Sequence, residues 1–259
     1  MSVLNHLQLT GSNLVLSQLE HIEIRNALAQ VLQELKEHSP SIEKIVPFGS
    51  YTHDTMLTRH ADKDAHVDLM IIYEDGAELE PKVLYERLII SIKALYGEAS
   101  LTSRAPDLNL EMGNARIRLV PAYKDWWGTH IADPRNARNN WTSTNPEKIL
   151  QEINNKNKLY KNEIKRLIRL FKYWNILNGR LYRSYDLELF ILSTLMTAGR
   201  NLSDYFKAVA ERLRTPSGAN EQEANLLLLK ENLQKGIDME NDGMPLEADS
   251  MIHIILPPL

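Results

Sequence analysis

Residues 46–73 read VPFGSYTHDTMLTRHADKDAHVDLMIIY, and this stretch decides the fold. An apolar strand leads into a tight turn at Gly49-Ser50, a polar segment follows, and a second apolar strand contains Asp68. Glycine lets a backbone approach phosphate closely and the serine hydroxyl adds a donor, so the turn is a candidate phosphate grip. We expect a helix to begin at this turn and to point its free N–H groups at the anion.

Asp68 is a candidate metal ligand on the second strand, 67–73, which is apolar enough to be buried on both faces. Nucleotidyl transfer with two Mg²⁺ ions needs about three carboxylates that converge from adjacent strands. An Asp-x-Asp pair would place two of them on the same face, because side chains alternate along a strand. The residue two positions before Asp68 is His66 instead.

The composition is that of an ordinary globular protein of 259 residues, with 43% apolar and 25% charged residues. A net charge of −4 gives no global attraction to nucleic acid. The chain has no cysteine, which excludes disulfides and thiolate metal sites. No signal-peptide pattern and no apolar run of membrane-spanning length occur, so we expect a cytoplasmic protein without a membrane partner.

The N-terminal half has a mixed pattern of helices and strands. Ser12-Asn13 is the expected N-cap of a long first helix that runs to Glu37. A Gly-Asn pair at 113–114 between two strand-like runs predicts a hairpin. The other expected elements of this half are strands at 42–48 and 67–73 and a helix at 81–95.

The C-terminal half is expected to be helical. Residues 124–145 are expected to form an irregular connection, and the four tryptophans are expected in the core or at a domain interface. The predicted domains are therefore 1–125 and 126–259, with the active cleft between them. Helices are expected at 147–178, 184–199, 202–213, 220–236 and 246–254.

Motifs along nearly the whole chain resemble one known family. They are Phe48-Gly49-Ser50-Tyr51, Thr55, Asp68-Leu69-Met70, Leu119-Val120-Pro121-Ala122, Arg169-Leu170-Phe171-Lys172-Tyr173-Trp174-Asn175 and Ser184-Tyr185-Asp186-Leu187-Glu188. In this order and spacing they are similar to the bacterial cyclic-oligonucleotide synthases, which are relatives of cyclic GMP-AMP synthase and oligoadenylate synthase. The resemblance implies an α+β fold, in which a polymerase-β-like nucleotidyltransferase palm is joined to a C-terminal helical domain.

The resemblance also implies roles for individual residues. Asp68 would be the second metal carboxylate, with Mg²⁺ or Mn²⁺ as the metal and ATP or GTP as the nucleotide. Tyr185 would stack on the donor base. The triphosphate would be held by Gly49, Ser50, Lys172 and Ser184. A serine at the start of a helix is also an ordinary N-cap, and that function is compatible with phosphate binding.

Two of the three expected carboxylates are replaced. His66 stands at the first position, and Arg118, immediately before the Leu-Val-Pro-Ala run, stands at the third. Histidine ligates Mn²⁺ better than Mg²⁺, whereas arginine stays protonated and repels a cation. Two-metal catalysis with Asp68 as the only remaining carboxylate is therefore disfavoured.

Three arrangements of this site are open at the level of sequence. Asp64, His66 and Asp68 could rebuild a single-metal site, with Glu111 nearby on the partner strand. Arg118 could instead neutralise a triphosphate without metal. In the third arrangement Arg118 forms an internal ion pair with Asp68, because an unpaired arginine in a buried cleft is costly.

Three functions follow. The first is a pseudoenzyme that binds nucleotide and acts in anti-phage defence signalling, with little or no turnover. The second is an active nucleotidyltransferase that makes cyclic or linear oligonucleotide messengers. The third is a nucleic-acid binder that uses a basic helix at 147–183. The pseudoenzyme of the first hypothesis could also act by binding a protein partner. The cations of that helix are Lys156, Lys158, Lys161, Lys165, Arg166, Arg169, Lys172, Arg180 and Arg183.

Overall fold

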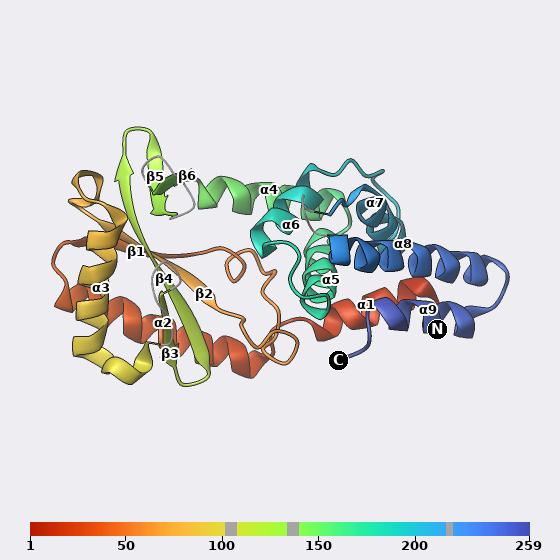
Figure 1. Ribbon diagram of the computed structural model, residues 1–259, viewed down its shortest axis with the longest axis horizontal. Coiled ribbons are helices and arrows are strands. Elements are labelled where there is room, and N and C mark those ends of the chain that lie inside the picture. Colours follow the sequence, from red (N-terminus) through yellow and green to blue (C-terminus); the bar gives the residue numbers. More distant parts are fainter. Residues whose placement is uncertain (102–107, 134–139, 216–219) are drawn as a thin grey trace. The chain divides into compact units, whose positions relative to one another are not determined.

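The computed structural model (Figure 1) describes residues 1–101, 108–133, 140–215 and 220–259, and they form two compact units. Unit 1 contains residues 1–15, 55–63 and 151–259, and unit 2 contains residues 16–54 and 64–150. The expected domain boundary after residue 125 falls inside unit 2, because the strands that follow it pair with the sheet. The segment 55–63 belongs to unit 1 although unit 2 flanks it on both sides in sequence.

The described strands of unit 2 form one mixed sheet in the order β1-β2-β4-β5-β6, with β3 paired to β4 (Figure 1). Among the described strands, only the pairing of β2 with β4 is parallel. Every residue of β2 is buried, as its apolar sequence predicts for a strand inside a sheet. The strands are β1 (Ile42–Phe48), β2 (Val67–Tyr73), β3 (Leu108–Met112), β4 (Ala115–Asp125), β5 (Gly128–Ala132) and β6 (Trp141–Thr144).

Two long helices cover one face of this sheet. Helix α2 (Gln18–His38) and helix α3 (Pro81–Tyr96) contact each other, and both contact β4. Two short 3-10 helices, Gly76–Glu78 and Glu98–Ser100, flank α3 in the chain. The strand and helix predictions for 42–48, 67–73, 81–95 and the 113–114 hairpin are confirmed.

The prediction of one long first helix is wrong, because the structure has two helices joined by a short non-helical link. Helix α1 (Val3–Asn13) belongs to unit 1, whereas α2 begins at Gln18 in unit 2. The N-cap of α2 is Ser17, whose hydroxyl accepts from the Glu20 N–H while the Glu20 carboxylate accepts from the Ser17 N–H at 2.7 Å. Ser-x-x-Glu is a capping box, and this pattern, rather than Ser12-Asn13, marks the start of the helix.

The expected irregular connection at 124–145 is also wrong for its described residues, 124–133 and 140–145, whereas residues 134–139 lie outside the described ranges. Most of these residues continue the sheet, because β5 pairs with β4 and β6 pairs with β5, both antiparallel. Trp141 and Trp174 are buried, as expected for core aromatics. Trp126 and Trp127, in contrast, lie fully exposed at the turn between β4 and β5.

Unit 1 is helical. Its helix α1 contacts α5, α7, α8 and α9, and α8 and α9 pack side by side. The rings of Phe171 and Phe206 stack with centroids 4.5 Å apart in its core. The helices of the C-terminal half are α4 (Pro146–Leu159), α5 (Ile164–Leu177), α6 (Ser184–Ser193), α7 (Leu202–Arg212), α8 (Asn220–Asn241) and α9 (Pro245–Ile255).

The predicted helix at 147–178 is two helices. Lys161 and Asn162 between α4 and α5 have φ angles of 55° and 64°, a left-handed conformation that ends a right-handed helix. Helix α6 stops at Ser193, and α8 continues to Asn241, beyond the predicted ends. Within the described ranges, no helix has the combined length and apolarity that a membrane crossing requires.

We predict that Ser17→Ala destabilises the first turn of α2 by about 0.5–2 kcal/mol, because it removes the acceptor for the Glu20 N–H. The measurement is amide hydrogen exchange in the first turn of α2. Ser12→Ala is the control, since the Ser12 hydroxyl only donates to the carbonyl of Gln8 within α1. An equal effect of both substitutions on α2 would contradict the assignment of the cap.

Candidate functional site

The Gly49-Ser50 turn follows β1 directly and packs against Asp68. Gly49 has a φ of +73°, and a Cβ at this position would lie 2.5 Å from Oδ2 of Asp68. Only glycine therefore permits both this backbone conformation and the close approach of the carboxylate. The N–H of His53 donates to the Gly49 carbonyl at 3.0 Å, which closes one helical turn.

The turn does not start a helix, so that expectation is wrong. Residues 49–54 form turns, and Asp54 has a left-handed φ of 57° that stops the helical path after one turn. The Thr52 hydroxyl also donates to the Gly49 carbonyl, at 2.9 Å. A phosphate at Ser50 would therefore meet local donors of the turn without the dipole of a full helix.

Asp68 lies buried on β2 and pairs with Arg118 on the neighbouring strand. The parallel register places the two residues opposite each other. The Arg118 Nε donates to Oδ1 of Asp68 at 2.5 Å, so the internal ion pair considered from the sequence is present. The Asp68 side chain is 8% exposed and that of Arg118 is 33% exposed. The guanidinium thus neutralises the carboxylate at the position where metals would gather.

His66 lies beside the same carboxylate. Its Nε2 is 3.6 Å from Oδ1 of Asp68, and its Nδ1 is 2.8 Å from the backbone carbonyl of Asp64. Because a carbonyl can only accept, Nδ1 carries a proton and donates this hydrogen bond. The imidazole orientation is therefore set by the backbone of the segment that precedes β2.

Arg116 engages the other two carboxylates that could have substituted as ligands. Its Nε donates to Glu111 Oε1 at 2.5 Å, and its Nη1 donates to Asp64 Oδ1 at 3.2 Å. The hydrogen bond to Glu111 raises the pKa of the Arg116 guanidinium above its usual value, so it stays charged. Two arginines on β4 thus neutralise three carboxylates, Asp64, Asp68 and Glu111.

This donor set does not fit a pair of Mg²⁺ ions. Mg²⁺ needs several oxygen ligands in octahedral geometry, and Oδ1 of Asp68 already accepts from a guanidinium. In the part of the chain that the structure describes, no three His, Asp or Glu residues are grouped so that they could hold a metal. A single-metal site of Asp64, His66 and Asp68 would require Arg116 and Arg118 to release two of these residues.

Lys172 lies on α5 and is buried in unit 1. Its Nζ donates to Glu188 Oε1 at 2.6 Å, to the Thr55 hydroxyl at 3.1 Å and to the Thr55 carbonyl at 3.2 Å. The Thr55 hydroxyl in turn donates to the Glu188 carboxylate. These acceptors match the three N–H donors of an ammonium group. The expected contact of Lys172 with phosphate stays a prediction, and it competes with this internal network.

Ser184 and Tyr185 lie at the exposed start of α6. Ser184 is the first helical residue rather than the N-cap; the cap position is Arg183, and no side chain caps this helix. Tyr185 is 47% exposed, and desolvation raises the pKa of its phenol. Arg183 forms two hydrogen bonds with Asp186, at 2.6 and 2.7 Å. A hydroxyl and a flat ring are therefore available here, and their roles toward a nucleotide stay predictions.

The basic helix expected at 147–183 is not a continuous cationic surface. It is interrupted between α4 and α5, and Arg169 and Lys172 are buried. Other members have internal partners: Lys161 donates to the Gly199 carbonyl, and ion pairs join Arg166 to Glu163, Arg180 to Asp62 and Arg183 to Asp186. Six of the nine cations are thus buried or bound within the chain, which reduces the cationic surface available to a nucleic acid, and the nucleic-acid hypothesis stays a prediction.

The predicted site residues fall into two groups. Unit 2 brings together Gly49, Ser50, His66, Asp68 and Arg118, and unit 1 contains Lys172, Ser184 and Tyr185. Sequence reasoning gave no role to Arg116, and it did not foresee that Thr55 and Glu188 hold Lys172. A buried lysine needs a carboxylate partner, but the identity of that partner depends on how α5 packs against α6.

Comparisons with known proteins identify the same fold. A family model described as "Second Messenger Oligonucleotide or Dinucleotide Synthetase domain" matches residues 1–157. The chain is similar to the structure of Escherichia coli MS115-1 CdnC with ATP, with 12% identity, coverage of 98% of this chain and 97% of that chain, and a TM-score of 0.74. No curated protein sequence matches.

Two further structures are similar over most of their length. Bradyrhizobium diazoefficiens CdnG in complex with GTP has 13% identity, coverage of 95% of this chain and 96% of that chain, and a TM-score of 0.69. Vibrio cholerae DncV cyclic AMP-GMP synthase has 12% identity, coverage of 97% and 94%, and a TM-score of 0.67. At these identities the likeness shows the fold, and the predicted polymerase-β-like fold with a helical C-terminal region is confirmed.

We predict that Lys172→Met destabilises unit 1 by about 3–5 kcal/mol, because it leaves the buried Glu188 carboxylate without its counter-charge. The measurement is chemical denaturation followed by fluorescence, to which the buried Trp174 on α5 contributes. Adding Glu188→Leu should restore most of the loss.

The matched control is Lys207→Met, which breaks the exposed pair with Glu211 on α7 and should cost less than about 1 kcal/mol. Equal losses for Lys172→Met and Lys207→Met would show that the buried network does not stabilise the fold.

Proposed function

Because the chain belongs to the family of second messenger oligonucleotide or dinucleotide synthetases, we propose that it is a nucleotide-binding member whose catalytic centre no longer binds metals. The observation that carries this proposal is the ion pair between Arg118 and Asp68, at 2.5 Å. A guanidinium takes the place of a metal-binding carboxylate and neutralises the one carboxylate that remains. The protein is then a pseudoenzyme with the fold of a nucleotidyltransferase.

The triphosphate of ATP or GTP is the proposed ligand of the Gly49-Ser50 turn. The turn approaches Asp68 so closely that a phosphate bound there lies near the guanidinium of Arg118. Guanidinium groups bind phosphate with two parallel hydrogen bonds, and the charge of Arg118 supplies attraction that Mg²⁺ supplies in a metal-dependent enzyme. Related structures with ATP and with GTP support this ligand class.

The guanidinium replaces only part of what a metal does. It attracts phosphate oxygens, but it cannot lower the pKa of an attacking hydroxyl as a coordinated metal does. His66 cannot act with Asp68 as a pair of oxygen ligands. We therefore expect nucleotide binding without nucleotidyl transfer, so that the bound nucleotide acts as a signal in anti-phage defence rather than as a substrate.

We predict that ATP binds in the presence of EDTA and that Arg118→Ala weakens this binding about tenfold to a hundredfold, as expected for the loss of one charge-assisted contact. Titration calorimetry measures both affinities. Arg87→Ala on α3 is the matched control, because it also removes an arginine that is paired to a carboxylate, Asp75 at 2.6 Å. Binding that requires Mg²⁺, or an equal loss in both variants, would contradict the proposed role of Arg118.

We further predict that the unmodified protein releases no pyrophosphate from labelled ATP or GTP with either Mg²⁺ or Mn²⁺. The double substitution His66→Asp and Arg118→Asp should create Mn²⁺ binding that calorimetry detects, because it restores oxygen ligands beside Asp68. Robust pyrophosphate release by the unmodified protein would overturn the assignment as a pseudoenzyme.

A further inference from the structure

The turn 49–54, which contains the proposed phosphate grip, ends in a backbone conformation that most residues disfavour. The N–H of Asp54 donates to the Tyr51 carbonyl at 3.2 Å, which closes the end of the turn. Asp54 has a φ of +57°, and a residue other than glycine keeps a left-handed conformation only where its surroundings hold it there. The shape of the turn therefore depends on what fixes its last residue.

Thr55 follows the turn directly, and buried charged groups bind both of its oxygen atoms. The Nζ of Lys172 donates to the Thr55 hydroxyl at 3.1 Å and to the Thr55 carbonyl at 3.2 Å, while the hydroxyl donates to the Glu188 carboxylate. All three side chains are buried. Because these contacts engage the main chain as well as the side chain, they fix the orientation of Thr55 and not only its position. Thr55 in turn is bonded directly to Asp54, the last residue of the turn.

The ammonium group of Lys172 has no N–H left for a phosphate in this arrangement. It has three donors, and three acceptors surround it, namely the two oxygen atoms of Thr55 and Glu188 Oε1 at 2.6 Å. A phosphate could bind Lys172 only by leaving the Glu188 carboxylate buried without its counter-charge, which is costly. The contacts of Lys172 thus favour a role within unit 1 over a direct contact with nucleotide.

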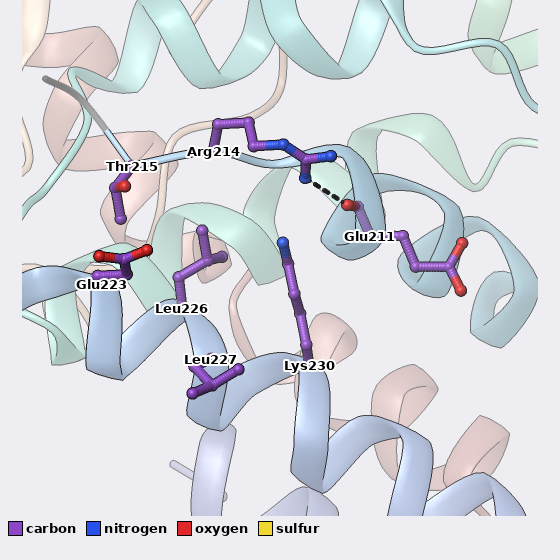
Figure 2. A pocket seen from close by; sticks show the side chains of 7 residues that line it. All are labelled: Glu211, Arg214, Thr215, Glu223, Leu226, Leu227 and Lys230. Atoms are coloured by element: carbon purple, nitrogen blue, oxygen red, sulfur yellow. Dashed lines mark hydrogen bonds between the residues drawn. The ribbon is translucent and has the colours of Figure 1, made fainter.

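A lysine elsewhere in unit 1 provides a comparison. Lys230 on α8 is partly buried and lines a hollow between the end of α7 and α8 (Figure 2). Its Nζ donates to the Leu213 carbonyl at 3.0 Å, a backbone acceptor of the same kind as the Thr55 carbonyl. Since this contact includes no residue of the turn and no neighbour of it, Lys230 is a matched control for Lys172.

We infer that Lys172 and Glu188 position the turn 49–54 through Thr55, and that Lys172 affects a bound nucleotide only through this turn. The second part rests on the proposed function, in which the Gly49-Ser50 portion of the turn binds a triphosphate. A turn that is already ordered binds more tightly than one that must become ordered when the ligand arrives. Lys172 is therefore a positioning residue, in contrast to the phosphate contact proposed for Arg118.

Amide hydrogen exchange of the free protein measures the turn without any nucleotide. Thr55→Val removes the hydroxyl while keeping a branched side chain of similar size, and it should speed exchange of the His53 and Asp54 amides about tenfold, as for the loss of one hydrogen bond to a charged group. The double substitution Lys172→Met and Glu188→Leu should have the same effect, because it removes the groups that hold Thr55 without leaving a buried charge.

Two variants separate a specific effect on the turn from a general loosening of unit 1. Thr55→Ser keeps the hydroxyl and should keep the slow exchange of the unmodified protein. Lys230→Met removes a lysine that also donates to a backbone carbonyl, and it should leave the exchange of the turn unchanged. Faster exchange of His53 and Asp54 in Lys230→Met would overturn the inference, because the turn would then respond to unit 1 as a whole.

The same variants test the role toward nucleotide. Titration calorimetry with ATP in EDTA should show binding about tenfold weaker both for Thr55→Val and for the double substitution of Lys172 and Glu188. If Lys172 contacted phosphate itself, the double substitution would lower the ATP affinity while Thr55→Val left it unchanged, and the inference would be wrong. It would also be wrong if the amides of the turn exchanged at the unmodified rate in both variants, as expected for a lysine that only stabilises unit 1.

Failure of the proposed function gives a different result. An unmodified protein that binds no ATP would contradict the nucleotide site and, with it, the second part of the inference. The exchange rates of the free protein would still decide whether Lys172 and Glu188 hold the turn through Thr55.

Discussion

The parallel pairing of β2 with β4 places residue 68 opposite residue 118, and the chemistry of unit 2 depends on which side chains stand there. Two carboxylates at these positions would repel each other unless cations lay between them. An aspartate and an arginine satisfy each other directly, and their contact at 2.5 Å needs no metal. Gly49 completes this arrangement, since any larger residue would collide with Oδ2 of Asp68.

A second ionic network fixes a segment that leaves the sheet domain and returns to it. Thr55, at the start of the segment 55–63, is bound by the buried Lys172 and Glu188. Asp62, near its other end, pairs with Arg180 at 2.7 Å, and the N–H of Thr58 between them donates to the Leu14 carbonyl. Both ends of the segment are thus tied to unit 1 by charged groups, and the buried pair would be costly to break.

Several arginines and lysines among the described residues act within the fold. Arg116 and Arg118 neutralise carboxylates on the sheet, and Lys172 neutralises Glu188 between helices. A cation with an internal partner contributes little to a long-range field around the protein. One surface feature that these networks do not explain is apolar, namely the pair of tryptophans at the β4–β5 turn.

By itself, the sequence determined the local elements that have strong periodic patterns. The buried strand 67–73, the Gly-Asn hairpin and the Gly49 turn were all predictable, as was the fold, because their residues restrict the backbone directly. The break before Ser17 was also encoded, in a capping box that the longer apolar pattern obscured. Residue identity alone also placed His66 and Arg118 at the two positions where the family resemblance led us to expect metal carboxylates.

Only the tertiary structure decided which charges meet. Sequence left three arrangements of this site open, and strand register selected Asp68 as the partner of Arg118. Lys172 was expected to reach phosphate from a basic helix, whereas helix packing buries it against Thr55 and Glu188. Trp126 was expected in the core or at a domain interface, but it lies exposed at the turn between β4 and β5. Pairing and burial depend on residues distant in sequence, and no local propensity specifies them.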